Sequence, residues 1–382
     1  MKDNPENDGI KTIFISALVY DGGVSGIAEY TRSLINSLLK EHKVCITLLK
    51  KDYKDFPIKS DHLKVIQVAN IFDAPLLNIF WHIVVLPILL LFLRIDFVIL
   101  PAINRRMALW VGKPTLGIIH DLSQYAIDGK YDIFRTFYVK YILPVMASSL
   151  NMVLAISENT KSDVIKYWHI DSKKIEVCYN GFNKTLFGQT PPNNTLEVIS
   201  RLGIDSEYLI YTSRIEHPGK NHINLIKAYE KLPDKIKQSH KLVFTGSDWT
   251  GAEHVRSYAK QSDDYNRIIF LGYVQTSDLP ALYHRASASI LPSLYEGFGI
   301  PLVEAMACGT ATLCSNNSAL NEVAGNASLT FNPNSSDDIA TKIKLVLTNH
   351  ELKKEIITKG LSRSKDFDWD VLGKTISKIF RT

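Results

Sequence analysis

The sequence has few cysteines, and their spacing is not that of a metal site or a disulfide framework. Its four cysteines, Cys45, Cys178, Cys308 and Cys314, form no Cys-x-x-Cys pair, so neither a zinc site nor a disulfide scaffold is indicated. We interpret them as small buried thiols of a protein that works in a reducing compartment. The polar segment Met1–Gly9 lacks the apolar run of a secretory signal, and we therefore expect a cytoplasmic protein.

A strong charge of one sign is also missing. The 44 Lys and Arg residues exceed the 39 Asp and Glu residues by five, which is too few to indicate a nucleic-acid-binding protein. The small basic excess fits a phosphorylated ligand or an anionic membrane surface. With 382 residues, 46% hydrophobic and 22% charged, the chain has the composition of a globular protein with two domains.

Short apolar runs alternate with helical patterns along the chain. The runs are continuously apolar, which is typical of parallel strands covered by helices on both faces. The sequence therefore predicts an α/β protein with two doubly wound halves. The predicted strands are Lys11–Leu18, Val44–Leu49, Val65–Ala69, Phe97–Pro101, Thr115–His120, Met152–Ile156, Ile175–Cys178, Leu209–Ser213, Leu242–Thr245, Ile268–Leu271, Ala286–Leu291 and Ala311–Cys314. The turn-rich segment Gly188–Thr195 suggests a boundary between an N-terminal domain, residues 1–190, and a C-terminal domain, residues 191–365.

The most informative stretch is Ser293–Gly309, which reads Ser-Leu-Tyr-Glu-Gly-Phe-Gly-Ile-Pro-Leu-Val-Glu-Ala-Met-Ala-Cys-Gly. Gly297 and Gly299 allow a tight turn between a strand and the start of a helix. A helix N-terminus offers N–H groups and a partial positive charge, which suit a phosphate. Glu296 and Glu304 flank this position and can accept hydrogen bonds from hydroxyl groups. A sugar nucleotide, whose phosphates lie between two hydroxylated groups, meets all of these conditions.

Glu296 and Glu304, with seven residues between them in a stretch that begins Pro-Ser-Leu-Tyr-Glu-Gly-Phe-Gly, resemble the signature of the retaining GT-B glycosyltransferases of family 4. The resemblance covers essentially the whole chain and is strongest over residues 208–325. It implies two Rossmann-like domains that face an interdomain cleft. The N-terminal domain would bind the acceptor and the C-terminal domain the nucleotide sugar. The last helix, within residues 366–382, would return to the N-terminal domain.

The resemblance also assigns roles within the central stretch. It implies that Glu304 holds the ribose hydroxyls of the donor and that Glu296 lies at the donor sugar. Gly297 belongs to the same donor-binding loop, and the N–H groups of Phe298 and Gly299 would assist at the diphosphate.

Two cations follow the first strand of the C-terminal half. Arg214 and Lys220 stand six residues apart around a Pro-Gly turn and can converge on one diphosphate from two sides. The alternative is a solvated loop with ordinary charges. The family carries a matching pair, which implies that both side chains neutralise the departing diphosphate. Gly246 and the loop with Tyr273 and Val274 follow neighbouring strands, and the family places the latter beside the nucleotide base.

Two candidate segments lie in the N-terminal half. Gly22 and Gly23 follow the first strand and suit a phosphate cradle, although any tight strand–helix turn favours glycine. The family has a Gly-Gly pair here, which faces the donor phosphates. His120 and Asp121 end a strand, where α/β proteins place their sites. A lone histidine is more often structural, but the pair matches the family's His-Asp pair, which implies that it orients the donor sugar or the acceptor hydroxyl.

Residues 76–93 carry no formal charge over eighteen positions, close to the length of a membrane span. Asn78, His82 and Pro87, and the strands predicted on both sides, favour a packed crossover helix. A partly exposed helix that contacts a membrane and a true span remain the alternatives.

A metal site is not expected. Asp366, Asp368 and Asp370 imitate an Asp-x-Asp metal motif, but we interpret them as acids at the start of the terminal helix, where they favour its dipole. The family implies catalysis without a divalent metal, and no other cofactor is indicated.

The sequence and the resemblance together predict a retaining glycosyltransferase that moves a hexosyl group from a nucleoside diphosphate sugar, GDP-mannose or a UDP-hexose, to a glycan acceptor. The resemblance implies attack from the leaving-group face, with the leaving phosphate taking the proton. Glu296 as a covalent nucleophile is the alternative. The apolar N-terminal helix and the aromatic residues of 125–141 favour a lipid-linked acceptor and peripheral contact with the inner face of the cell membrane. This would place the protein in lipopolysaccharide, capsule or exopolysaccharide synthesis in a bacterium.

Other classes of protein are alternatives to this prediction. An inactive GT-B subunit that binds a glycan or a partner transferase would not need the Glu, Arg and Lys set. A nicotinamide enzyme that uses the loop at Gly22 would need a spaced Gly-x-Gly-x-x-Gly, which this loop lacks. A GT-B epimerase or phosphorylase would differ in whether an acceptor is required.

Overall fold

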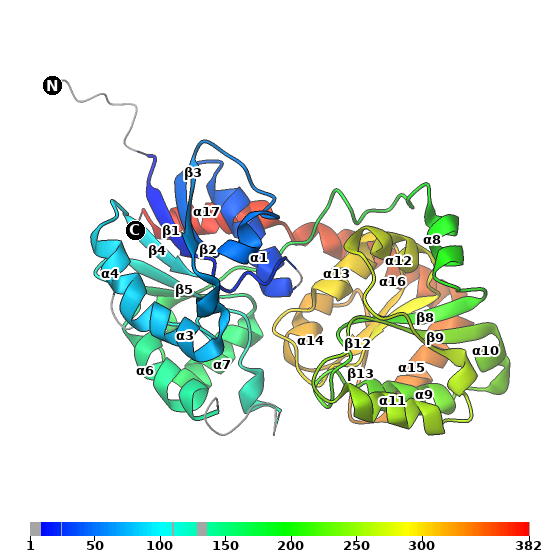
Figure 1. Ribbon diagram of the computed structural model, residues 1–382. Helices are drawn as coiled ribbons and strands as arrows, with labels where there is room; N and C mark the ends of the chain where they lie inside the picture. Colours follow the sequence, from blue (N-terminus) through cyan, green and yellow to red (C-terminus); the bar gives the residue numbers. More distant parts are fainter. Residues whose placement is uncertain (1–8, 24, 109–110, 128–135, 382) are drawn as a thin grey trace. The chain divides into compact units, whose positions relative to one another are not determined.

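The computed structural model describes residues 9–23, 25–108, 111–127 and 136–381. With those gaps, residues 9–125, 136–180 and 368–381 form a first compact unit, and residues 126–127 and 181–367 form a second. Each unit contains one parallel sheet with helices on both faces (Figure 1). The predicted α/β architecture with two doubly wound halves is confirmed.

The sheet of the first unit has the strand order β3-β2-β1-β4-β5-β6-β7, and every neighbouring pair is parallel. The order reverses between β1 and β4, which makes the carboxyl ends of these two strands a usual place for a site. Its strands are β1 (Thr12–Ser16), β2 (Lys43–Leu49), β3 (Leu63–Val68), β4 (Phe97–Leu100), β5 (Thr115–Ile119), β6 (Met152–Ala155) and β7 (Ile175–Val177).

Helices cover both faces of this sheet. Alternate strand residues point to opposite faces, and Phe14 and Cys45 point into a core cluster shared with α4, α6 and α7. α1 and α17 lie on the other face (Figure 1), packed along each other. The helical segments of the first unit are α1 (Gly26–Leu38), α2 (Lys50–Tyr53), η2 (Asn70–Asp73), α3 (Pro75–Phe80), η3 (Trp81–Val85), α4 (Leu86–Leu91), η4 (Ser123–Tyr125), η5 (Tyr138–Ile142), α6 (Leu143–Ser148), α7 (Glu158–Trp168), η6 (Ser172–Lys174) and α17 (Trp369–Ile379).

The uncharged segment 76–93 forms the predicted packed crossover, but in three pieces: α3, the π-helical turn η3, and α4. Its inward residues Trp81, Leu86 and Leu90 are buried, whereas Leu76 and Phe92 are 81% and 82% exposed. Among the residues that the structure describes, no helix is both long and apolar enough to cross a membrane. Of the aromatic segment 125–141, residues 128–135 lie outside the described part.

The sheet of the second unit has the order β10-β9-β8-β11-β12-β13, again fully parallel. Every predicted strand is found, and the structure adds β13, a strand of sequence Leu-Thr-Phe that was not predicted. Its strands are β8 (Glu207–Thr212), β9 (His240–Thr245), β10 (Ile268–Phe270), β11 (Ala288–Leu291), β12 (Thr312–Ser315) and β13 (Leu329–Phe331). Its helical segments are α8 (Thr195–Arg201), α9 (His222–Glu230), α10 (Asp234–Ser239), α11 (Ala252–Gln261), η7 (Tyr265–Arg267), η8 (Thr276–Asp278), α12 (Leu279–Arg285), α13 (Ile300–Ala307), α14 (Ser318–Ala324), α15 (Ser336–Thr348), α16 (His350–Arg363) and η9 (Ser364–Asp366).

Candidate active site

The loops after β8, β9 and β10 meet at the carboxyl edge of the second sheet. The N–H of Gly246 donates to the carbonyl of Gly272 over 2.7 Å. Gly246 has φ +130°, and a Cβ there would run into the backbone of Ser213, so only glycine fits this position. The close packing places the loops that carry Arg214 and Tyr273 side by side.

Lys220 and Glu296 form the centre of the candidate site. The Nζ of Lys220 lies 2.5 Å from Oε1 of Glu296, and both side chains are less than one-fifth exposed. The residues are brought together because the loop after β11 folds onto the loop after β8, where the N–H of Leu294 donates to the carbonyl of Gly219 over 2.9 Å. The sequence predicted that both side chains act at one ligand, but it did not predict that they bind each other.

Neighbouring hydroxyl groups hold this ion pair in place. The Oγ of Ser293 donates to Oε1 of Glu296 over 2.7 Å, and it lies 3.0 Å from the hydroxyl of Tyr211, which donates to the carbonyl of Lys220. Burial by itself would lower the pKa of Lys220, but the carboxylate of Glu296 and the Tyr211 hydroxyl outweigh it, so the pKa is raised. Lys220 therefore carries its charge at every physiological pH.

Arg214 lies in the same charged group, although it is more open to solvent. One of its terminal nitrogens is 3.1 Å from the carboxylate of Glu216, and its side chain remains 43% exposed. The guanidinium stacks over Trp249, 4.8 Å from the ring centre, so the ring restricts the orientation of the guanidinium. Glu216 also raises the pKa of Lys220, which connects the two predicted cations through one carboxylate.

Glu304 is a partly buried residue of α13. Burial raises its pKa from 4.5 to about 8, and the Tyr283 hydroxyl, 3.5 Å from its Oε2, opposes this only in part. The carboxyl group is therefore mostly protonated at neutral pH in the ligand-free protein. A ligand that donates hydrogen bonds to the carboxylate would reverse this balance.

The glycine loop in front of α13 has the geometry that the sequence predicts. Gly299 precedes the helix with φ +98°, and a Cβ there would lie 2.5 Å from Leu320. The ring of Phe298 is buried and meets Phe367 edge to face, 5.4 Å between ring centres. Gly297 lies in the same loop, beside Glu296. Because the Phe298 ring points inward, any contact of this residue with a ligand has to come from its backbone.

The loop after β10 offers one exposed and one buried side chain. Tyr273 is 60% exposed, whereas Val274 is buried. An exposed tyrosine at the carboxyl edge of the sheet is available to stack on a flat ligand group.

The remaining predicted residues lie in the first unit. Gly22 and Gly23 follow β1 with φ +69° and +85°, a conformation that favours glycine. Ser25 caps α1 by accepting from the N–H of Ala28. The loop therefore leads to a capped helix N-terminus.

His120 and Asp121 follow β5 at the carboxyl edge of the first sheet. The Nε2 of His120 lies 2.7 Å from the carbonyl of Pro101, and burial lowers the pKa of this histidine to about 4. His120 is therefore neutral and donates through Nε2. Asp121 accepts from both the N–H and the Oγ of Ser123, so its carboxylate also orders the following turn.

The three aspartates that imitate a metal motif are engaged separately. Asp366 pairs with Arg363, Asp370 pairs with Lys40, and Asp368 caps α17. Within the described ranges, no group of three or more His, Cys, Asp or Glu side chains could hold a metal ion.

The structure adds residues that sequence reasoning missed. Ser293, Tyr211, Glu216, Trp249 and Tyr283 all contact predicted site residues. Ser293 and Glu216 stand within three residues of a predicted residue, so their proximity was a usable signal. Trp249 and Tyr283 reach the site from other loops and helices, and no spacing in the sequence marks them.

The chain matches two family models along most of its length. Residues 24–186 match the model described as Glycosyltransferase Family 4, and residues 195–363 match the model described as Glycosyl transferases group 1.

Similar proteins include two mannosyltransferases of Escherichia coli. O-antigen chain mannosyltransferase B is 29% identical over 252 residues, which is 66% of each protein. The serotype-specific mannosyltransferase WbdA is 28% identical over 263 residues, 67% of this chain and 32% of that protein. The chain thus spans just under two thirds of the first relative and about a third of the second.

A solved structure shares the whole fold. The crystal structure of Anabaena Alr3699/HepE in complex with UDP and glucose matches with a TM-score of 0.76 and 18% identity, over 98% of this chain and all of that one. At this level of identity the match concerns the fold alone.

Proposed function

Because the chain belongs to the GT-B glycosyltransferases of family 4, we propose that it moves a hexosyl group from a nucleoside diphosphate sugar to a glycan hydroxyl with retention of configuration. The single observation that carries this proposal is the Lys220–Glu296 pair, with Arg214 beside it, at the carboxyl edge of the second sheet.

A sugar diphosphate complements this charged group. Its phosphate oxygens would bind the cationic side chains of Lys220 and Arg214, and its sugar hydroxyls would donate hydrogen bonds to Glu296. As the bond to the sugar breaks, negative charge grows on the departing diphosphate, and the two cations stabilise it in the transition state. The backbone N–H groups at Phe298 and Gly299 would add to this stabilisation at the start of α13.

Glu304 would bind the nucleotide end of the donor. Its partly buried position suits hydroxyl donors such as those of ribose, because two hydrogen bonds can stabilise the carboxylate that burial otherwise disfavours. Tyr273, exposed after β10, would lie beside the base.

Retention of the sugar's configuration is best explained by attack of the acceptor hydroxyl on the face of the sugar that carries the leaving group. The leaving phosphate would accept the proton of that hydroxyl. A covalent route through Glu296 is less favourable, because Lys220 and Ser293 already hydrogen-bond its Oε1 and reduce its nucleophilicity. His120, neutral and held against Pro101, would orient a sugar hydroxyl together with Asp121. No step in this scheme requires a divalent metal.

The donor and the pathway are proposed from the relatives. Two of them are named as mannosyltransferases, one of the O-antigen chain, so GDP-mannose is the first donor to test and UDP-hexoses are the next. We propose a lipid-linked glycan acceptor at the cytoplasmic face of the membrane, in the synthesis of a bacterial surface polysaccharide.

The test is transfer by alanine variants with a matched control. Arg214→Ala and Lys220→Ala should each lower kcat by about 100-fold, as expected for a lost contact to developing charge. Lys241→Ala is the control, because Lys241 also lies 2.5 Å from a carboxylate, that of Asp205, but where β9 begins, at the opposite edge of the same sheet. Its turnover should match the wild type.

Three outcomes would contradict parts of the proposal. Wild-type turnover in both site variants would contradict the assignment of Arg214 and Lys220 to the departing diphosphate. Failure of the purified wild-type protein to transfer or hydrolyse any sugar in a panel of GDP-, UDP-, dTDP- and ADP-sugars would favour a non-catalytic subunit. Turnover that persists in excess EDTA is expected, and its loss would contradict metal-independent catalysis.

A further inference from the structure

Two asparagines of the second unit stand directly before helices without capping them. Asn221 precedes α9 and Asn317 precedes α14, and neither side chain accepts a capping hydrogen bond from its own helix. An asparagine in front of a helix usually serves as such a cap. In both residues the amide group instead donates hydrogen bonds to loops that are distant in the sequence.

The amide of Asn221 connects three loops at the carboxyl edge of the second sheet. Its Nδ2 donates to the carbonyl of Pro292 over 2.9 Å and to the carbonyl of Pro333 over 2.8 Å. Pro292 follows β11, Pro333 follows β13, and Asn221 itself lies in the loop after β8. Asn221 is 6% exposed, and both hydrogens of its amide are used. The amide therefore ties the loop of Lys220 to the loop of Glu296 from inside the protein.

Asn317 holds the loop of Glu296 from the loop after β12. Its Nδ2 donates to the carbonyl of Leu294 over 2.8 Å. The Oγ of the next residue, Ser318, accepts from the N–H of Glu296 over 3.1 Å. Side chains of two other loops thus hold segment 292–296 at both ends and in the middle.

These hydrogen bonds matter most when the donor is bound. In the ligand-free protein the ion pair of Lys220 and Glu296 helps to hold the two loops together. A sugar diphosphate would open this pair, because its phosphate binds the lysine and its hydroxyls bind the carboxylate. The amides of Asn221 and Asn317 contact neither charged group, so their hydrogen bonds can remain. We propose that the two asparagines are positioning residues that keep Lys220 and Glu296 at the sugar diphosphate after their ion pair has opened.

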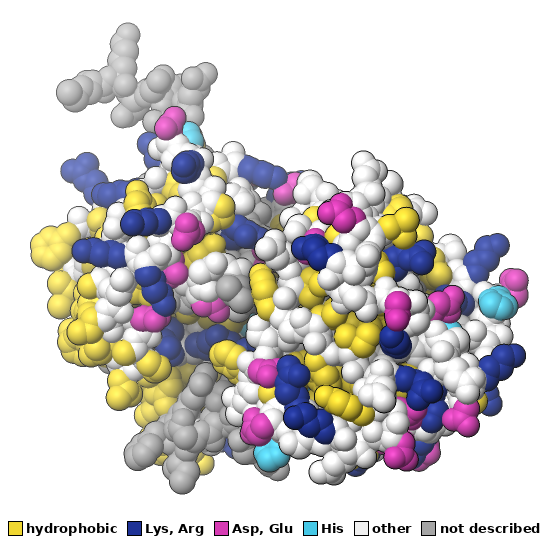
Figure 2. Space-filling model, turned by 45° about the vertical axis from the view of Figure 1, so that its right-hand side comes forward, with side chains coloured by type: hydrophobic (Ala, Val, Ile, Leu, Met, Phe, Trp, Pro, Cys, Tyr) yellow, Lys and Arg dark blue, Asp and Glu magenta, His cyan; other side chains and the backbone are white. Residues whose placement is uncertain are grey.

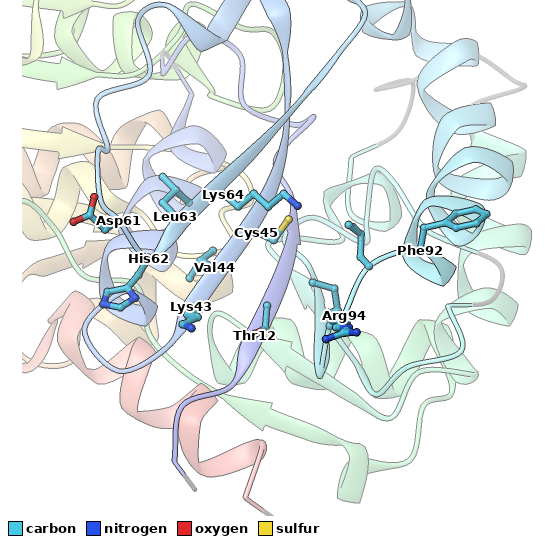
Figure 3. A pocket seen from close by; sticks show the side chains of 12 residues that line it. Thr12, Lys43, Val44, Cys45, Asp61, His62, Leu63, Lys64, Phe92 and Arg94 are labelled. Atoms are coloured by element: carbon cyan, nitrogen blue, oxygen red, sulfur yellow. The ribbon is translucent and has the colours of Figure 1, made fainter. Parts of the chain in front are cut away.

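Neither surface charge nor a large pocket marks these two residues. Cationic and acidic side chains are interspersed over the face of the second unit that Figure 2 shows. A pocket of about 540 Å³ lies in the first unit, where Thr12, Lys43 and Leu63 begin β1, β2 and β3 (Figure 3). It opens at the amino edge of that sheet, whereas α/β proteins place their sites at the carboxyl edge. The buried hydrogen bonds therefore distinguish Asn221 and Asn317.

The experiment is steady-state transfer to a water-soluble glycan acceptor by full-length variants. Asn221→Gly removes one amide and still tolerates the φ of +61° at this position, and Asn317→Ala removes the other. Each should lower kcat about tenfold, because a small displacement of a charge-stabilising group is enough for such a loss. The donor KM should change by less than about twofold, since the displaced groups act most strongly in the transition state.

Asn224→Ala is the matched control. Asn224 lies on α9 and also donates to the carbonyl of Pro333, over 3.1 Å, but in the described structure its amide is not hydrogen-bonded to segment 292–296. Its kcat should match the wild type. His62→Ala, an exposed change in the pocket of the first unit, should also match it. Circular dichroism and melting temperatures establish that all variants are folded.

A second measurement separates positioning from a general loss of stability. In the Lys220→Ala background, Asn221→Gly should lower kcat by less than about twofold, because the cation that Asn221 positions is already gone. A change that merely loosens the fold would lower kcat by the same factor in both backgrounds. Should Asn221→Gly fail to fold, Asn317→Ala, which alters a less buried residue, decides the question.

The remaining outcomes overturn the proposal. Wild-type kcat in Asn221→Gly or in Asn317→Ala would remove that residue from the positioning role. An equal loss in Asn224→Ala, or a full tenfold further loss in the Lys220→Ala background, would assign the asparagines to the fold alone. The role rests on the proposed function, but the two can fail separately: absence of transfer by the wild type contradicts the proposed function, whereas unchanged asparagine variants of an active enzyme contradict only the positioning.

Discussion

The pKa of Glu304 offers the sharpest test of the donor site. Burial raises this pKa to about 8, whereas the proposed contact with ribose hydroxyls needs the carboxylate. Only the ionised fraction of the protein can then bind donor, and the apparent affinity scales with that fraction. The ionised fraction is about 1% at pH 6, about 10% at pH 7 and one half at pH 8. Donor affinity should therefore rise about 50-fold between pH 6 and pH 8, and less than about twofold from pH 8 to pH 9.

The assay is calorimetric titration with a sugar nucleotide from pH 6 to pH 9, on the wild type and on Glu304→Gln. The glutamine keeps the size of the side chain and removes its proton, so the variant should bind weakly with a flat pH profile. Glu355→Gln, an exposed change on α16, controls for the substitution. Identical pH profiles of the wild type and Glu304→Gln would refute the assignment. An affinity that falls as the pH rises would mean that the protonated carboxyl group donates to the ligand instead.

The same shift has a consequence for the ligand-free protein. The pKa of Glu304 in the folded state is raised above its ordinary value of 4.5, so the folded state binds more protons than the unfolded state between about pH 4.5 and pH 8. The contribution of Glu304 to the free energy of unfolding is therefore complete below pH 4.5 and is lost as the pH rises to about 8. Urea unfolding of the wild type and Glu304→Gln across this window should show the variant gaining relative stability with pH.

Two further predictions concern packing. In Gly373→Ala, the new Cβ on α17 would lie 2.8 Å from the Cβ of Ser37 on α1, so we expect the free energy of unfolding to fall by about 1–3 kcal/mol; unchanged denaturant curves would contradict this close helix packing. In Trp249→Ala, Arg214 loses the ring 4.8 Å beneath it, and nucleotide binding should weaken about twofold to fivefold. Unchanged affinity in calorimetry would mean that Trp249 does not position Arg214.

Much of the fold was predictable because its signals are local. Most of the strands contain a short run of apolar residues, and glycines such as Gly246 and Gly299 stand where positive φ or close packing excludes a side chain. The candidate residues of the second unit were predictable for the same reason, because parallel strands bring their carboxyl ends to one edge.

The contacts between distant loops could not be predicted. Lys220 and Glu296 are separated by 76 positions, and their pairing depends on how two loops fold onto each other. The pKa of Glu304 depends on its burial, which raises it, and on the hydroxyl of Tyr283, from another helix, which opposes this shift. Nor did the uniformly apolar segment 76–93 reveal which side chains face the core, because both sides of these helices are apolar.

The charge balance of the ligand-free site suggests how it selects its ligand. Near neutral pH Lys220 is paired with Glu296, Arg214 with Glu216, and Glu304 is mostly protonated, so this group of five side chains is close to neutral. A diphosphate alone would bind the two cations but leave the partly buried carboxylate of Glu296 without its partner, which would weaken the free energy of binding. A sugar on the diphosphate supplies hydroxyl donors to that carboxylate, and the nucleoside supplies donors to Glu304. We expect the site to favour the complete sugar nucleotide because only that ligand replaces every interaction that its binding disrupts.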